Sequence, residues 1–231
     1  MIAGLQKMTL LDYPGKVACT VFLQGCNFRC PFCHNSELLG AGAEKLMDEA
    51  QFLAFLKGRR GLLDAVCVSG GEPTLTKGLD DLLRSIKALG YSVKLDTNGS
   101  NPKVLKRLVA EGLVDYVAMD VKNSPERYAQ TVGLSQVDLT AIEESLRFLL
   151  EGNVPYELRT TVVAQLHDDA AIDQMGSWVA TLGKPGKWFL QKFTDRDTVI
   201  FSGLSAPDDS RLATWRERLS CYAEHAAIRG E

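Results

Sequence analysis

The chain has 231 residues, of which 45% are hydrophobic and 24% charged, with a formal net charge of −3 at pH 7. This composition provides enough apolar residues for a sizeable core, and the weak charge offers none of the basic surface that nucleic-acid binding needs. The N-terminus lacks the features of a signal peptide, and no apolar run approaches the roughly 20 residues of a membrane-spanning helix. We therefore expect a cytoplasmic protein that binds neither nucleic acid nor membranes.

Six short apolar runs predict buried strands, and the segments between them have the periodicity of amphipathic helices. After a short polar lead, the expected strands are residues 17–23, 64–69, 91–95, 114–119, 156–163 and 188–192. The expected helices are residues 48–57, 78–89, 102–111, 125–130, 140–150, 170–182 and about 208–227. Strands that alternate with helices predict an α/β fold with a parallel sheet and right-handed crossovers.

Polar motifs follow four of the expected strands. They are a cysteine loop at residues 24–36, Gly-Gly-Glu-Pro at 70–73, Asp-Thr-Asn-Gly at 96–99 and Asp-Val-Lys at 120–122. Ligands in α/β folds bind outside the carboxyl ends of the strands. The position of these motifs therefore predicts one ligand site at that rim.

Three cysteines, Cys26, Cys30 and Cys33, lie within the cysteine loop. A structural zinc site takes four ligands, and the histidines of this chain supply no second pair at ligand spacing. A [4Fe–4S] cluster normally takes four thiolates, so three thiolates leave one iron open to a small molecule. We predict a catalytic cluster here, and a zinc-binding or electron-transfer module is the alternative from another functional class.

The other three cysteines have no spacing that suggests a fourth ligand. Cys19 and Cys67 lie in strand-like runs, where a free cysteine usually behaves as a small buried hydrophobe. Cys221 lies in an amphipathic C-terminal stretch and is also interpreted as structural.

The cysteine loop, with Phe32 before its last cysteine, and Ser-Gly-Gly-Glu-Pro at 69–73 resemble the radical S-adenosylmethionine (SAM) enzymes. The resemblance implies a partial (β/α)6 TIM-like barrel, formed by residues 1–231 as a single domain. A full barrel needs eight such units and typically about 250 residues, so six units suit this length. The resemblance also implies that the open iron holds SAM, which is cleaved to methionine and a 5′-deoxyadenosyl radical.

The resemblance assigns the motifs to SAM. Glycines allow close approach of the backbone to a ligand, and Glu72 would accept a charge-assisted hydrogen bond from the SAM ammonium group. Lys122 would offer a cation to the SAM carboxylate, and His34 would contact the adenine through its backbone and not ligate the cluster. The residues implied to bind SAM are Phe32, Cys33, His34, Gly70, Gly71, Glu72, Asp96, Asp120, Val121 and Lys122.

The resemblance further implies that Asp96, Thr97 and Asp120 surround a monovalent cation, and hard oxygen ligands suit such an ion. The residues alone also fit a plainer interpretation, in which 96–99 is a capped turn and Asp120–Lys122 an exposed pair. Arg159 either points toward substrate or pairs with a carboxylate. Residues 167–169 are expected to form a polar loop that caps the next helix.

Three segments narrow the family. Residues 96–99 and 120–122 resemble the glycyl-radical-enzyme activases, and residues 10–35 resemble the activating proteins of anaerobic ribonucleoside-triphosphate reductase. This implies hydrogen abstraction from a glycine of a large partner enzyme, with a flavodoxin- or ferredoxin-type electron donor. The alternatives are an activase of a pyruvate formate-lyase-type enzyme and a small-molecule enzyme such as a 7-carboxy-7-deazaguanine synthase.

One departure from the activase pattern concerns the end of the sixth strand. Pyruvate formate-lyase activating enzymes carry a SAM-contacting histidine there, whereas this chain has Leu-Gln-Lys-Phe-Thr at 190–194. Gln191 or Thr194 would have to supply the missing hydrogen bond. The departure weakens the pyruvate formate-lyase alternative more than the reductase one.

Overall fold

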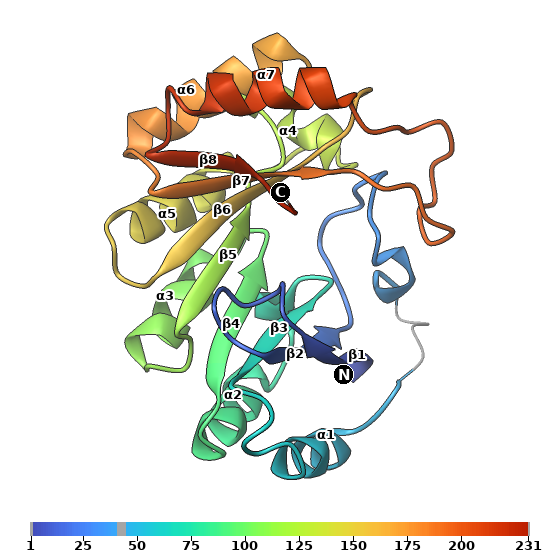
Figure 1. Ribbon diagram of the computed structural model, residues 1–231, viewed down its shortest axis with the longest axis vertical. Helices are drawn as coiled ribbons and strands as arrows, with labels where there is room; N and C mark the ends of the chain where they lie inside the picture. Colours follow the sequence, from blue (N-terminus) through green and yellow to red (C-terminus); the bar gives the residue numbers. More distant parts are fainter. Residues whose placement is uncertain (1, 41–44, 231) are drawn as a thin grey trace. The chain divides into compact units, whose positions relative to one another are not determined.

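The computed structural model describes residues 2–40 and 45–230, and Figure 1 labels the elements within them. The strands are β1 Ile2–Thr9, β2 Ala18–Leu23, β3 Ala65–Gly70, β4 Ser92–Thr97, β5 Tyr116–Asp120, β6 Tyr156–Val162, β7 Lys187–Lys192 and β8 His225–Ile228. The helices are α1 Glu49–Lys57, α2 Leu79–Ala88, α3 Pro102–Ala110, α4 Pro125–Thr131, α5 Leu139–Leu150, α6 Asp169–Leu182 and α7 Asp209–Leu219, with 3-10 turns at Ser36–Leu38 and Pro73–Leu75. Among these helices none is long and apolar enough to cross a membrane.

The predicted α/β fold is confirmed. The six expected strands appear as β2 to β7, and each is followed by at least one helix. The strand order in the sheet of the described residues follows the chain from β1 to β8. β1 and β8 were not predicted, so the sheet has a further strand at each edge.

The polar lead contains β1, which pairs antiparallel with β2. Only Ile2 and Thr9 at its ends are buried, and the strand is otherwise partly or fully exposed. A strand with so little buried surface shows almost no apolar alternation, which is the pattern that sequence prediction uses. For this reason no strand is predicted in the polar lead.

The predicted C-terminal helix is too long, because α7 ends at Leu219 and β8 follows. Buried residues at Leu212, Trp215, Leu219 and Ala223 continue the helical spacing beyond the end of the helix. The chain instead pairs in parallel with β7, and the backbone of His225 donates to Gly186 O. Sheet hydrogen bonds therefore override the helical periodicity in this segment.

The described chain divides into two compact units, and each is considered by itself. Unit 1 comprises Met1–Asn27, Glu37–Thr97 and Lys103–Ala118; unit 2 comprises Phe28–Ser36, Asn98–Pro102 and Met119–Glu231. The boundary falls within the cysteine loop, so Cys26 belongs to unit 1 whereas Cys30 and Cys33 belong to unit 2.

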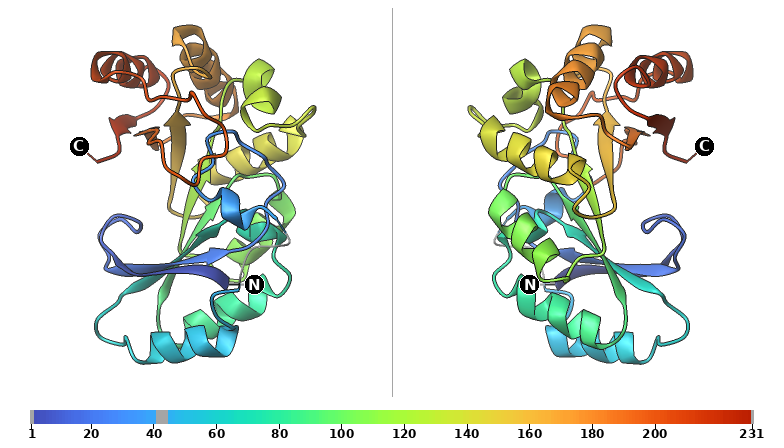
Figure 2. Two further views of the ribbon diagram at one scale, coloured as in Figure 1. Left: turned by 90° about the vertical axis from the view of Figure 1, so that its right-hand side faces the viewer. Right: turned by 90° about the vertical axis from the view of Figure 1, so that its left-hand side faces the viewer.

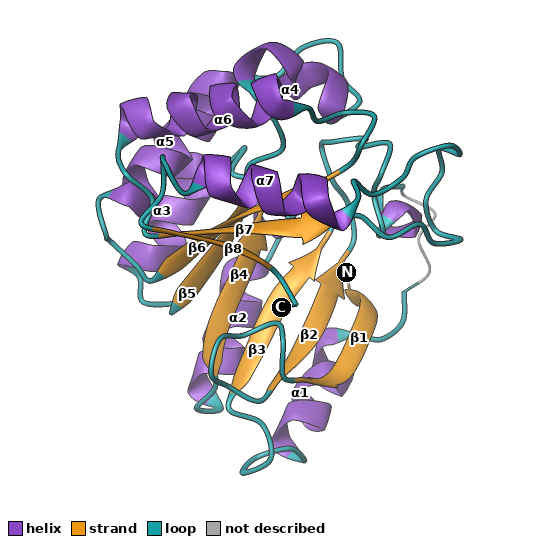
Figure 3. Cartoon of the chain, turned by 45° about the horizontal axis from the view of Figure 1, so that its top comes forward, coloured by secondary structure: helices purple, strands orange, loops and turns teal. Residues whose placement is uncertain are grey.

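Unit 1 is built on β1 to β4, which Figure 3 shows as neighbouring arrows. β2, β3 and β4 are parallel, and their register places Thr20, Cys67 and Lys94 in one row. Residues in register on neighbouring parallel strands point to the same face of the sheet. α1 and α2 lie side by side (Figure 2), and α2 buries Leu83 and Ile86.

Unit 2 contains the parallel strands β6, β7 and β8, and α6 packs beside α7 (Figures 1 and 3). Trp188 of β7 and Trp215 of α7 are both fully buried. The indole Nε1–H of Trp215 donates to Asp169 Oδ1 at 2.7 Å, which ties α7 to the first turn of α6. Large aromatic side chains therefore form much of the core of this unit.

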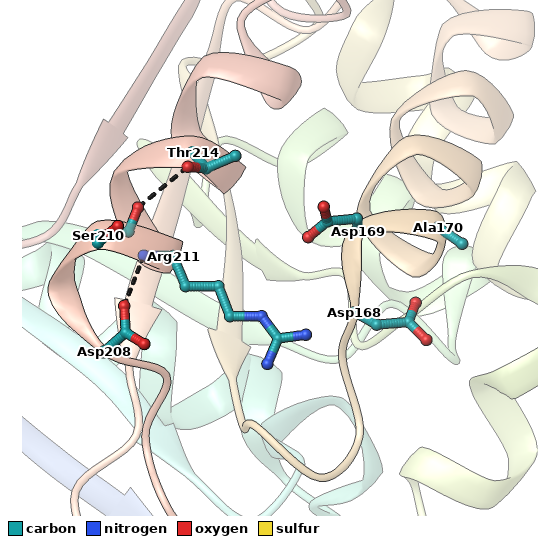
Figure 4. A pocket seen from close by; sticks show the side chains of 7 residues that line it. All are labelled: Asp168, Asp169, Ala170, Asp208, Ser210, Arg211 and Thr214. Carbon is teal, nitrogen blue, oxygen red and sulfur yellow. Dashed lines mark hydrogen bonds between the residues drawn. The ribbon is translucent and has the colours of Figure 1, made fainter.

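Figure 4 shows the first turns of α6 and α7, with the side chain of Arg211 extending between them. Asp168 Oδ1 accepts a hydrogen bond from Ala171 N at 2.8 Å, and Asp208 Oδ1 accepts one from Arg211 N at 2.7 Å. Both aspartates are therefore N-caps, which confirms the cap predicted within residues 167–169.

Candidate active site

In unit 1, the Gly-Gly-Glu turn after β3 is bonded to the start of the cysteine loop. Gly71 N donates to Leu23 O at 2.9 Å, and Glu72 N donates to Gly25 O at 2.7 Å. Gly25 N in turn donates to Leu38 O at 2.8 Å. Backbone hydrogen bonds from two directions therefore fix the residues that lead into Cys26.

The double glycine is required by this close backbone approach. Gly70 has φ +125°, and a Cβ built on it would lie 2.2 Å from Leu23 O. A Cβ on Gly71 would lie 2.1 Å from Gly25 O. The sequence analysis assigned these glycines to contact with a ligand, but in unit 1 their missing side chains admit the backbone of the cysteine loop. Their proposed contact with SAM remains a prediction.

The Glu72 carboxylate is 1% exposed and held by two threonines. Its Oε1 accepts hydrogen bonds from Thr74 N at 3.1 Å, Thr74 Oγ1 at 2.5 Å and Thr97 Oγ1 at 2.8 Å. A buried carboxylate with several donors is fixed in one orientation. The structure thus gives Glu72 and Thr97 a shared structural role, and their predicted roles toward SAM and a cation stay predictions.

Asp96, at the end of β4, forms an ion pair that the sequence analysis missed. Its Oδ1 lies 2.5 Å from Nζ of Lys94, whose side chain is fully buried while that of Asp96 is 15% exposed. Lysine is almost never fully buried without a partner. A lysine inside an otherwise apolar strand was the signal that would have found this pair.

In unit 2, the remainder of the cysteine loop is held by backbone contacts and by a small apolar cluster. Cys33 N donates to Cys30 O at 3.1 Å, which closes a tight turn, and Arg29 N donates to Val132 O at 2.8 Å. Gly133 has φ +69°, and a Cβ there would lie 2.1 Å from Arg29 O.

The apolar cluster consists of Phe32, Val163 and Phe193, with Cys30 packed against it. Phe32 is 4% exposed. The aromatic residue before the last cysteine therefore anchors the loop in the core of unit 2.

The His34 side chain anchors the same loop to the segment after β7. Its ring stacks on Phe193, with ring centroids 5.5 Å apart and an angle of 15° between the planes. Nε2 lies 2.6 Å from Thr194 O and donates to it, since a carbonyl oxygen only accepts. Burial lowers the pKa of His34, which favours the neutral ring. The predicted contact between the His34 backbone and adenine remains a prediction.

Asp120, Lys122 and Arg159 form a connected charged group in unit 2. Asp120 Oδ2 lies 2.8 Å from Lys122 Nζ, and Asp120 Oδ1 lies 3.0 Å from Arg159 Nε. The side chains of Lys122 and Asp120 are 14% and 26% exposed, so they are not the exposed pair of the plainer interpretation. Of the two alternatives for Arg159, the structure shows pairing with a carboxylate. Val121 N, between the charged residues, donates to Arg159 O at 2.8 Å.

The charge on Lys122 is stabilised by its surroundings. Burial disfavours the charged ammonium, but the Asp120 carboxylate, with Cys30 adding to it, outweighs burial and raises the pKa of Lys122. Its Nζ also lies 6.0 Å from the centroid of the Phe32 ring, at the limit of a cation–π contact. Lys122 therefore offers a fixed positive charge beside the cysteine turn of unit 2.

His167 is buried and holds the backbone of Lys122, a role that the sequence did not reveal. Its Nε2 lies 2.9 Å from Lys122 O and donates to it, and its Nδ1 accepts a hydrogen bond from Val163 N at 3.1 Å. Burial lowers the pKa of His167, so the neutral ring with this tautomer is favoured. The loop at 167–169 is therefore not fully exposed as a polar loop would be, because His167 is buried.

We expect acid to destabilise the protein through His167. Its pKa is lowered in the folded state, so below the unfolded value of about 6.5 the unfolded chain binds a proton that the folded chain does not. The free energy of unfolding should fall as pH decreases from about 6.5, by up to about 1.4 kcal/mol per pH unit until the folded pKa is reached. Urea unfolding at a series of pH values measures this slope. His34, whose pKa is also lowered, adds to the slope.

The variant His167→Gln should reduce the acid slope, and His225→Gln, at an exposed position, should leave it unchanged. An unchanged slope in His167→Gln would show that the buried ring does not titrate in the unfolding transition. Both variants replace a histidine with glutamine, so the difference between their slopes excludes any general effect of losing a histidine.

The six cysteines are free thiols and differ in their surroundings. Cys19 and Cys67 are fully buried, and burial raises the pKa of each to about 12, which confirms the prediction of small buried hydrophobes. Cys221 is exposed. Only Cys26, Cys30 and Cys33 combine partial exposure with loops fixed by backbone hydrogen bonds, and this donor set fits an iron–sulfur cluster.

Within the described residues, no group of three His, Cys, Asp or Glu side chains forms a complete metal site. One of the three loop thiols belongs to unit 1 and two belong to unit 2. Ligation of a cluster by these three cysteines is therefore a prediction from the sequence, which the local anchoring in each unit supports.

A match to the radical SAM superfamily covers residues 20–173, more than half of the chain. The chain belongs to the radical SAM superfamily. This membership implies a [4Fe–4S] cluster and SAM as cofactors, and it identifies the protein as a radical SAM enzyme.

Proteins similar to this radical SAM enzyme include glycyl-radical activases. The "Putative glycyl-radical enzyme activating enzyme" of Methanocaldococcus jannaschii is 30% identical over an alignment 241 positions long, which covers 99% of this chain and 95% of the relative. The pyruvate formate-lyase-activating enzyme of Streptococcus mutans is 29% identical, covering 79% of this chain and 73% of the relative. A solved domain of a pyruvate-formate lyase-activating enzyme from Bacteroides vulgatus shares the fold, with a TM-score of 0.59, 21% identity, and coverage of 72% and 99%.

Proposed function

We propose that this radical SAM enzyme is a glycyl-radical activase whose partner is an anaerobic ribonucleoside-triphosphate reductase. In the proposed reaction, SAM, one electron and a glycine of the partner yield methionine, 5′-deoxyadenosine and a glycyl radical. The observation that carries the proposal is the similarity to an activase over 99% of the chain. The resemblance of residues 10–35 to the reductase activating proteins supports the choice of partner.

In this proposal, Cys26, Cys30 and Cys33 hold the cluster. When bound, the cluster and SAM supply the reductive cleavage that generates the hydrogen-abstracting radical. The residues of the chain bind and orient. In unit 2, the ammonium of Lys122 suits the carboxylate of SAM, and Asp120 keeps that ammonium charged.

In unit 1, Glu72 is the proposed acceptor for the SAM ammonium group, and its threonine partners hold it in place. The resemblance assigns Asp96, Thr97 and Asp120 to a monovalent cation, but in unit 1 the Lys94 ammonium already contacts Asp96, so we do not include a free cation in the proposed function. No residue of the chain needs to act as acid or base in the central hydrogen transfer, because the cofactor supplies the reactive group.

Further parts of the proposal concern the protein as a whole. We propose that residues 1–231 act as one radical SAM domain, because the family match at 20–173 includes segments of both compact units. We also propose a flavodoxin- or ferredoxin-type electron donor and a cytoplasmic location, where such donors and a reduced cluster are maintained. Neither nucleic acid nor membrane is part of the proposed reaction.

The proposal predicts a glycyl radical on the reductase. Anaerobically reconstituted protein, a chemical reductant and SAM should generate a glycyl-radical signal in the electron paramagnetic resonance spectrum of the partner, with one 5′-deoxyadenosine formed per radical. A partner in which the radical glycine is replaced by alanine should give no signal. If SAM is cleaved but no radical appears on any glycyl radical enzyme, the protein is not an activase and the small-molecule alternative is favoured.

The activase of a pyruvate formate-lyase-type enzyme is the second candidate. The similarity to pyruvate formate-lyase-activating enzymes, at 29% identity over 79% of the chain, favours it. The same assay, run with the reductase and with the pyruvate formate-lyase-type enzyme at equal concentration, separates the two candidate functions. A reductase activase should produce the radical signal only on the reductase, and a pyruvate formate-lyase activase only on the lyase.

A further inference from the structure

Lys94 is a charged residue in the interior of unit 1. Lys94 is fully buried in the middle of β4, between apolar residues Val93 and Leu95 that are also fully buried. Its register partner on β3 is Cys67, and the partner of Cys67 on β2 is Thr20. The three side chains therefore point to the same face of the parallel strands.

The charges on this face are arranged around Lys94. Its Nζ lies 2.5 Å from Oδ1 of Asp96, two residues along the same strand. On the neighbouring strand β2, Thr20 Oγ1 donates to Asp12 Oδ2 at 2.6 Å. Lys94 lowers the pKa of the Cys67 thiol, whereas burial, the larger effect, and the carboxylates of Asp96 and Asp12 raise it. The ammonium is thus close to this row of polar groups and forms an ion pair with Asp96.

An ammonium buried to this extent must be compensated by an opposite charge. Asp96 supplies that charge at the carboxyl end of β4, where ligands of α/β folds bind. The sequence analysis assigned Asp96 to a free monovalent cation. In unit 1, however, a positive charge from the chain itself already contacts this carboxylate. A second cation close by would be repelled by the ammonium.

We propose that Lys94 is a tethered cation, which provides at Asp96 the positive charge that a free potassium or sodium ion would otherwise supply. The inference rests on the proposed function in one respect, namely that Asp96 belongs to the SAM site. Lys94 is a positioning residue in this proposal, because it acts through Asp96 and not on SAM itself. If Lys94 has this role, the protein should function without any specific monovalent cation.

The test compares potassium chloride with tetramethylammonium chloride at equal ionic strength, since tetramethylammonium is too large to replace potassium among carboxylate ligands. Two quantities are measured on the full chain: the melting temperature, and the dissociation constant of SAM for the cluster-loaded protein. For the wild type, both should be the same in the two salts. For Lys94→Met, potassium should raise the melting temperature, and SAM should bind about tenfold or more weakly without potassium than with it.

Two control variants isolate the charge at Asp96. The double variant Lys94→Met with Asp96→Asn should lose the potassium dependence, because it removes the carboxylate together with the ammonium that contacts it. Lys87→Met removes a lysine that also contacts an aspartate, with Nζ 2.7 Å from Asp115 Oδ1, but is 30% exposed and outside the candidate site. It should show no difference between the salts.

The proposal is overturned if the wild type is stabilised by potassium to the same extent as Lys94→Met. It is also overturned if Lys94→Met shows no difference between the salts. Should Lys94→Met fail to fold in tetramethylammonium, the proposal requires potassium to restore folding, and failure in both salts counts against it. None of these measurements uses a partner enzyme, so a negative result in the glycyl-radical assay leaves the test of Lys94 intact.

Discussion

Replacing Cys30 with serine should abolish SAM cleavage and remove most of the iron from the reconstituted protein. The site offers three thiolates to the cluster, and a serine hydroxyl, which stays protonated near neutral pH, is a far weaker ligand for cluster iron than a thiolate. Changes to residues around metal ligands cost up to about 100-fold, so loss of a ligand should leave less than about 1% of the wild-type rate. Iron content, the absorbance of the cluster and the yield of 5′-deoxyadenosine measure the effect.

The matched control is Cys221→Ser, which makes the same chemical change at an exposed cysteine outside the loop. Iron content and SAM cleavage should match those of the wild type. Cys30→Ser with four irons and normal SAM cleavage would show that Cys30 is not a cluster ligand. Because Cys30 is only partly buried where it packs against Phe32 and its neighbours, the serine variant should still fold.

Replacing Gly71 with alanine should destabilise the protein by about 3 kcal/mol, at the upper end of the usual cost of overpacking. The new Cβ would meet the carbonyl oxygen of Gly25, which is backbone and cannot rotate away. The clash can be relieved only if the cysteine loop and the turn at Glu72 move apart, so SAM binding should weaken as well. Urea unfolding of the cluster-free protein measures the first effect, and SAM binding to the cluster-loaded protein measures the second.

Gly58→Ala is the control for the glycine change. Gly58 caps α1 with φ −75°, and its Cβ would lie no closer than 3.5 Å to another atom. Its stability should change by less than about 0.5 kcal/mol, as expected for a surface substitution. An equally small change in Gly71→Ala would mean that the turn and the loop are not in the contact described for unit 1.

The strand–helix alternation was predictable because each expected strand is a short apolar run bounded by polar turn residues. β3 illustrates this, since four consecutive residues from Ala65 to Val68 are fully buried. The two unpredicted strands have weaker patterns. β1 is mostly exposed, and the helical spacing of buried residues continues past the end of α7 to Ala223, just before β8.

The site was predictable where residue type alone limits the chemistry, as with the cysteine loop and the acidic and basic residues at 120–122. It was not predictable where the partner is distant in sequence. His167 bonds to the backbone of Lys122, 45 residues away, and Thr97 bonds to Glu72, 25 residues away. Hydrogen bonds of this kind leave no periodicity in the sequence, and only the folded chain reveals them.

The Gly-Gly pair shows a second limit of prediction from the sequence. The residue type correctly indicated a close approach to Gly70 and Gly71, but the approaching group is the backbone of the cysteine loop within unit 1. A glycine indicates that something is near without identifying it. The identity of the neighbour depends on the pairing of β2 with β3, which sets the cysteine loop beside the turn.

The division of the chain into two units has a consequence for how the protein can be cut. The polypeptide passes from one unit to the other after residues 27, 36, 97, 102 and 118, so neither unit is a continuous stretch. A fragment that starts at residue 119 would lack Phe28–Ser36 and, with it, both cysteines of unit 2. No single cut in the polypeptide therefore separates the two units, and a cut between residues 97 and 118 leaves Phe28–Ser36 of unit 2 on the N-terminal product.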